Sequence, residues 1–359
     1  MKKIYTQPRT ETMATTPQQM LCASGGIKAQ ISGYKAGTSG GFSQTFIWLT
    51  CLGMTFLGAS CGSNTPDQPK QQAELKPRTL IVTQTDPAHT PMRRICNATI
   101  TEEDGALNAL WSVGDEVSYR NLSREAYSDP TEGSVPLSGT LRADKAENTA
   151  SFTGDRIWCI EDDQIALVYP KVASFDFHDS PLTGSYTISL AGQDGTLTTL
   201  AKSYHHIYGI ANVTSVTETT ANADLAVMKS LLTVCKFSFV DKDAATETPL
   251  AIDKLTIAYG GTGTYNGKYP QTGTVAIAHN TPTANVTVTP ATPSEALTID
   301  PGTPSPTEVY VALFPEGGKT TYRFTVTSGS DTYTGEAEAT LNEGEFVIAT
   351  LQLKKHPTD

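Results

Sequence analysis

The chain has 359 residues, 26 of them basic and 37 acidic, and a formal net charge of −11. Phosphate binding needs clustered Lys and Arg, so this charge balance argues against nucleic acid as a partner. Thr, Gly, Ser and Pro are abundant and helix-favouring runs are scarce. The composition therefore predicts an all-β protein of short strands joined by turns.

Residues 1–45 are rich in Gly, Ser, Thr and Gln and show no periodic apolar pattern. We expect this leader to be disordered. It is either a sign that the start codon is assigned too far upstream or a true extended leader. In both cases it lies outside the folded part of the chain.

Residues 46–61, FIWLTCLGMTFLGASC, hold an apolar run that ends in small residues and a cysteine. The run is shorter than the roughly 20 residues of a membrane span. It fits the apolar core and cleavage site of a secretory signal over residues 46–60. A cysteine directly after that site resembles a bacterial lipobox, which predicts that Cys61 becomes the lipidated, palmitate-bearing first residue. The alternative is a buried strand or helix.

Residues 61–77 are polar and contain proline, as expected of a tether between a lipid anchor and a folded body. A strand rich in β-branched residues is predicted at 79–85. Arg78 stands directly before it, in a Lys-Pro-Arg that we expect to be exposed. A loop with Arg93 and Arg94 follows.

Further strands are predicted up to residue 213, at 95–101, 117–119, 150–153, 164–170, 186–190 and 205–213. Gly114-Asp115 is typical of a turn and lies just before the strand predicted at 117–119. A second series begins with the alternating segment 233–240 and continues at 250–259, 273–278, 284–289, 308–315, 321–326, 331–334 and 345–353. The sequence thus predicts two β-sandwich domains, residues 78–228 and 229–359, with a boundary near 226–231.

Four features of the sequence resemble the fimbrillin-like proteins of Bacteroidales, the family of FimA-type and Mfa-type pilus subunits. They are the lipobox at Cys61, the WSVGDEV pattern at 111–117, the strand end Tyr169-Pro170, and the transition at 224–240 with its closing GEFVIATL. The resemblance implies two tandem transthyretin-like β-sandwich domains and a surface-exposed lipoprotein of the cell outer membrane.

The resemblance also implies how such a subunit assembles into a fimbria. An arginine-specific protease removes the first strand of the N-terminal domain, and a strand from a neighbouring subunit fills the groove. Arg78 is the predicted processing site, with Arg93 and Arg94 as rivals. The partners would be other fimbrial subunits, the outer membrane and surface ligands of host or bacterial cells, with this chain as stalk, tip or anchor.

No nucleophile elbow, phosphate loop, dinucleotide fingerprint or zinc-protease motif occurs, so we expect no enzyme, cofactor or metal site. His205-His206 is expected at the surface, and Cys96, Cys159 and Cys235 are expected as buried hydrophobes. Trp111 and Trp158 are either core residues or sugar-stacking residues. Sugar stacking by these tryptophans would favour a competing function, glycan binding by a surface lipoprotein of a nutrient-uptake system.

Overall fold

The computed structural model describes residues 75–84, 99–103, 105–124, 137–147, 149–173, 176–179, 182–278 and 285–356. Strands make up nearly all of the secondary structure there, which confirms the predicted all-β class. Within these ranges, no helix has the length and hydropathy needed to cross a membrane. The leader, the signal segment 46–60 and Cys61 lie outside the described residues.

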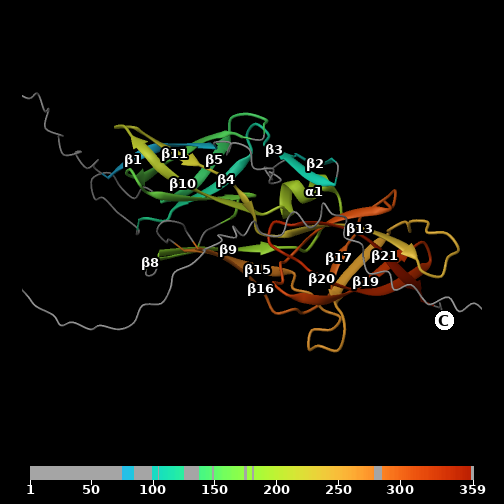
Figure 1. Ribbon diagram of the computed structural model, residues 1–359. Coiled ribbons are helices and arrows are strands. Elements are labelled where there is room, and N and C mark those ends of the chain that lie inside the picture. The colour runs from blue at the N-terminus through green and yellow to red at the C-terminus, as the bar shows by residue number, and fades with distance from the viewer. Residues whose placement is uncertain are drawn as a thin grey trace, which may run out of the picture. The chain divides into compact units, whose positions relative to one another are not determined.

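The first part of the chain forms a sheet with the strand order β11-β1-β6-β5-β4-β7-β10-β12, in which β10 also pairs with β11 (Figure 1). Every strand except β12 therefore belongs to a closed ring, and we call this part the barrel. Its strands are β1 (Lys76–Gln84), β4 (Glu116–Asn121), β5 (Ser138–Ala143), β6 (Ser151–Cys159), β7 (Gln164–Tyr169), β10 (Ile207–Val216), β11 (Thr220–Leu225) and β12 (Lys229–Ser230).

The barrel interior is a separate hydrophobic core packed around Trp111. The Trp111 ring lies edge-on to Phe152 and to Tyr169, with ring centroids 4.8 and 5.5 Å apart. The predicted turn before β4 is present: Gly114 has a φ of +86°, and the backbone N–H of Ser112 donates to the Asp115 carboxylate at 2.7 Å. Because this turn leads into β4, it positions the inward-facing Val117 and Tyr119.

The second part of the chain forms a sheet with the order β17-β14-β19-β20-β21-β13-β18, which we call the C-terminal sheet. Its strands are β13 (Thr233–Asp241), β14 (Lys254–Tyr259), β17 (Leu297–Ile299), β18 (Glu308–Leu313), β19 (Lys319–Ser328), β20 (Asp331–Thr340) and β21 (Phe346–Lys355). A second hydrophobic core, with Phe237, Phe239 and Phe324 in mutual contact, lies against it.

A four-stranded sheet with the order β16-β15-β9-β8 combines strands from both parts. Its strands are β8 (Asp176–Asp179), β9 (Leu182–Ser189), β15 (Thr272–Ala278) and β16 (Asn285–Pro290). β9 pairs with β15 in antiparallel register from Thr183↔Ala278 to Ser189↔Thr272. Strand pairing thus crosses the predicted boundary near residue 228.

Three short elements complete the fold. The hairpin β2 (Thr99–Glu103) and β3 (Ala106–Leu110) is tied to β13 by an ion pair of 2.9 Å between Glu102 and Lys236. The helical turns α1 (Leu197–Thr199) and η2 (Leu200–Tyr204) follow β9. The Thr196 hydroxyl caps α1 by accepting the backbone N–H of Thr199 at 3.2 Å.

The turn after β9 covers the outer edge of β18 and also contacts the residue that follows β17. The Gln193 side chain accepts the backbone N–H of Ala312 at 2.7 Å and donates to the Ala312 carbonyl at 3.0 Å, as a neighbouring strand would. The Gln193 carbonyl accepts from Asp300 beyond β17, and the Gly195 carbonyl accepts from Tyr310 in β18. This turn therefore covers the outer edge of β18 against further pairing.

Candidate functional site

β1 is paired along both of its edges. It runs parallel to β11, from Thr79↔Thr220 to Gln84↔Leu225, and antiparallel to β6, from Lys76↔Cys159 to Thr83↔Ser151. Since β11 also pairs with β10, β1 is the strand that joins the two ends of the ring. Loss of β1 would leave β11 and β6 each with an unpaired edge.

The alternation of side chains in β1 gives it one face toward the barrel core. Leu80 and Val82 are both fully buried, whereas Thr83 points outward and is exposed. Gln84, on the inward face, accepts a hydrogen bond from the indole N–H of Trp111 at 3.0 Å. β1 thus supplies both apolar packing and the polar partner of the largest core side chain.

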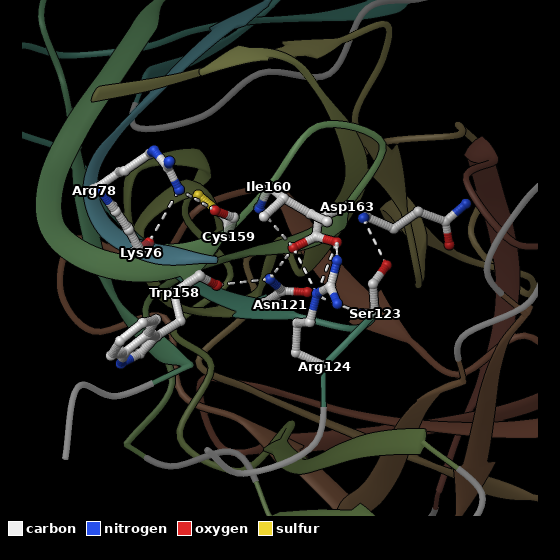
Figure 2. Close-up of polar contacts among 10 residues, drawn as sticks. Lys76, Arg78, Asn121, Ser123, Arg124, Trp158, Cys159, Ile160 and Asp163 are labelled. Carbon is white, nitrogen blue, oxygen red and sulfur yellow. Dashed lines mark hydrogen bonds and ion pairs between the residues drawn. The ribbon is translucent and has the colours of Figure 1, made fainter. Parts of the chain in front are cut away.

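Arg78 lies inside β1 and is 3% exposed, so the expectation of an exposed Lys-Pro-Arg before the strand is wrong. Its Nε donates to the carbonyl of Thr217 at 2.6 Å. One Nη donates to the carbonyl of Cys159, also at 2.6 Å (Figure 2). A guanidinium can satisfy several carbonyls at once because it carries five N–H donors. Arg78 therefore fixes the start of β1 between the end of β6 and the residues before β11.

The end of β6 is held by a second buried polar group, the carboxylate of Asp163 (Figure 2). Asp163 is 2% exposed and accepts from Asn121 Nδ2 at 2.9 Å, from the backbone N–H of Ile160 at 3.1 Å and from Arg124 at 2.6 Å. Asn121 Nδ2 also donates to the carbonyl of Trp158 at 2.9 Å. The carbonyl that Arg78 contacts thus belongs to a segment already fixed by hydrogen bonds.

This cluster has the chemistry of a structural site. Burial, followed by the nearby Asp163 charge, raises the pKa of the Cys159 thiol to about 12, so the thiol stays protonated at neutral pH. The prediction that Cys159 and Cys235 are buried is confirmed, and both thiols are free. Cys96 lies outside the described residues.

Both tryptophans considered for sugar stacking are buried, Trp111 at 1% and Trp158 at 3% exposure. They are core residues, the alternative that the sequence left open. Neither ring face is available to a ligand at the surface.

The surface position expected for the two adjacent histidines is wrong. His205 is fully buried and His206 is 7% exposed. Burial, and for His205 also the neighbouring His206, lowers their pKa values to about 3 and about 4. They lie at the start of β10, where the His206 carbonyl accepts the backbone N–H of Leu231 at 2.9 Å.

Of the remaining predicted site residues, Cys61, Arg93 and Arg94 lie outside the described residues. The last two residues of the predicted tether, Lys76 and Pro77, belong to β1. Sequence reasoning missed Gln84 and Asn121, whose partners are far away in the chain. The local alternation of buried positions in β1 is the one signal that points to Gln84.

No protein-family model matches the sequence, and no curated protein matches it significantly. Among solved structures, the chain is similar to a candidate cell adhesion protein from Bacteroides uniformis, with 15% identity and a TM-score of 0.47. The match covers 81% of this chain and 99% of that protein. A candidate cell adhesion protein from Bacteroides ovatus is 13% identical, with a TM-score of 0.43. That match covers 80% of this chain and 97% of the other protein.

A fimbrial assembly protein from Parabacteroides distasonis is 9% identical, with a TM-score of 0.36. The match covers 77% of this chain and 91% of that protein. All three likenesses are partial, since their TM-scores lie below 0.5. The structures that this chain resembles therefore include adhesion and fimbrial assembly proteins.

Proposed function

We propose that the protein is a structural or adhesive subunit of a bacterial surface fimbria, exported as a lipoprotein through Cys61 and assembled by β-strand addition. The observation that supports this proposal is the position of β1 as the strand that joins the ends of the barrel. The partners in this proposal are other fimbrial subunits and the outer membrane, and the role is structural and not enzymatic.

The barrel without β1 has a specific need for a replacement strand. The core positions that Leu80 and Val82 occupy would be open to water. Burial of each such side chain stabilises a fold by about 1.5–3 kcal/mol. The backbone groups of β11 and β6 that face β1 would also lose their partners. An extended segment from another subunit with apolar residues at alternate positions would restore both the packing and the ladder.

The position of a cut decides whether β1 can leave. A cut after Arg78 divides β1 and leaves Thr79–Gln84 attached to the rest of the chain. A protease would also reach Arg78 only after this buried residue had left the sheet. Arg93 and Arg94 follow β1 in sequence, so a cut there would separate the whole strand from the barrel. We therefore place the processing step at Arg93 or Arg94.

Treatment of the purified protein with an arginine-specific protease tests this proposal. We expect the parent protein to form a ladder of detergent-resistant polymers on a gel run without boiling. The double variant Arg93→Lys plus Arg94→Lys should give no ladder, whereas the matched control Arg78→Lys should still polymerise. N-terminal sequencing should find a new terminus after Arg93 or Arg94.

Two results would contradict the proposal. A new terminus at Thr79 together with polymerisation would return the processing site to Arg78. Complete release of β1 with the protein remaining monomeric would exclude strand addition. For export, Cys61→Ser should release the protein from membranes, and continued membrane retention would contradict lipidation.

The competing function, a glycan-binding surface lipoprotein, loses the residues on which it depended. Trp111 and Trp158 are buried, and replacing Trp111 would damage the barrel core whether or not a sugar binds elsewhere.

A further inference from the structure

β16 ends the four-stranded sheet and pairs only with β15. Among the described residues, no other segment forms a hydrogen bond along the outer edge of β16. This differs from β18 at one end of the C-terminal sheet, where the turn at Gln193 covers the outer edge. Within the described ranges, the outer edge of β16 is therefore unpaired.

The register of the β15–β16 hairpin shows which backbone groups point outward. The backbone N–H of Ala291 donates to the carbonyl of Thr272 at 2.9 Å, which makes these two residues a hydrogen-bonded pair. Hydrogen-bonded pairs alternate along an antiparallel ladder, so Thr289 and Thr287 also direct their backbone groups toward β15. Val286 and Val288 consequently direct their N–H and C=O groups away from the sheet.

The chemistry of this edge is unusual for an unpaired strand. Natural sheets protect exposed edges with charged residues, bulges or proline. From Asn285 to Thr289 there is no charged side chain and no proline, and Pro290 protects only the last position of the strand. Val286 and Val288 are half-buried on the core side, and Thr287 is exposed on the other face.

We propose that β16 pairs with β16 of a second copy of this chain, in antiparallel register about a two-fold axis at Thr287. In that register Val286 of each copy lies opposite Val288 of the other, and Thr287 lies opposite its own counterpart. The outward N–H and C=O groups of both valines then form hydrogen bonds across the axis. The apolar face and the threonine face each continue from one copy into the next.

The sequence of β16 favours a second copy as the occupant. A two-fold contact places each residue opposite the same strand reversed, and Val-Thr-Val reads the same in both directions. Two chains that each carry a net charge of −11 repel one another, and an uncharged strand lets them meet without like charges directly opposite. The contact uses the edge of β16 and leaves β1 in place, so it is independent of strand addition at the barrel.

Sedimentation equilibrium of the purified full chain tests the contact. We expect a concentration-dependent dimer. Val288→Pro removes an N–H that β15 does not use, and Thr287→Lys places two lysines opposite each other at the axis. Each variant should weaken dimerisation at least tenfold. Thr274→Lys, on the same exposed face but in the inner strand β15, should dimerise as the parent does.

Cross-linking tests the register separately. Under mild oxidation Thr287→Cys should give a disulfide-linked dimer beyond the parent background, and Thr274→Cys should not. A parent protein that stays monomeric, or a dimer that both β16 variants leave unchanged, would overturn the proposal. Equal cross-linking of the two cysteine variants would also overturn it.

Discussion

The strand order of the barrel closes on itself, whereas that of the four-stranded sheet stays open. In the barrel the ends meet through β1, so every backbone edge of the ring is paired. In the four-stranded sheet β16 has a neighbour on one side only among the described residues. A closed ring accepts a new strand only after one of its own has left, whereas an open edge can accept one directly. The proposed strand addition at the barrel would therefore need processing, whereas the proposed contact at β16 would not.

Acidification should give the largest effect and should act through His205 and His206, which directly precede β10. The folded-state pKa values of His205 and His206, about 3 and about 4, lie below the unfolded value near 6.5. The unfolded chain then binds more protons, so the free energy of unfolding is highest above pH 6.5 and falls as the pH is lowered toward 4. Two such groups remove up to about 2.7 kcal/mol per pH unit.

Urea denaturation at pH 6.5 and at pH 5 measures this loss. The variant His205→Gln plus His206→Gln should lose much less stability over the same interval. An unchanged slope in that variant would show that other groups titrate.

Truncation within β1 comes next in size. Leu80→Ala removes a fully buried side chain from the barrel core and should lower the free energy of unfolding by about 2–5 kcal/mol. Thr83→Ala, in the same strand but exposed, should change it by less than about 0.5 kcal/mol. Urea denaturation of both variants compares them, and equal effects would mean that β1 is not part of the core in solution.

Removal of the Arg78 guanidinium should have a smaller effect. Arg78→Met keeps an unbranched side chain but leaves the carbonyls of Thr217 and Cys159 without their donor, which costs about 1.5–3 kcal/mol. Hydrogen exchange should show β1 opening more often than in the parent. Arg142→Met removes an exposed ion pair with Glu116 and should cost about 1 kcal/mol or less.

The smallest effect concerns the covered edge of the C-terminal sheet. Gln193→Ala removes both side-chain hydrogen bonds to Ala312 and should lower stability by about 1–2 kcal/mol. It should also expose the outer edge of β18, detectable as slow self-association in light scattering. If the variant remains as stable and as monodisperse as the parent, the turn does not protect this edge.

Strands with strong alternation were predictable from the sequence, and their pairing was not. The segments 164–170 and 233–240 correspond to β7 and β13, because their β-branched and aromatic residues mark them locally. β3 and β11 were missed because ALNAL and TANADL contain residues that do not favour strands.

The position of Arg78 could not be predicted because its partners are distant in sequence. Lys-Pro-Arg has the local character of an exposed loop, and Thr217 lies 139 residues further along the chain. The same holds for His205-His206, whose burial depends on elements that meet only in the folded state.

The pairing of β9 with β15 makes the folding of the first and second parts of the chain interdependent. Thr183 lies opposite Ala278, so only the edge of β9 toward β8 can pair before residues 272–278 are present. The apolar side chains Tyr186 and Ile188 of β9 belong to the second hydrophobic core. A chain truncated near residue 228 would lack β15 and would leave Tyr186 and Ile188 without most of their core, so we expect β9 to be prone to aggregation in such a fragment.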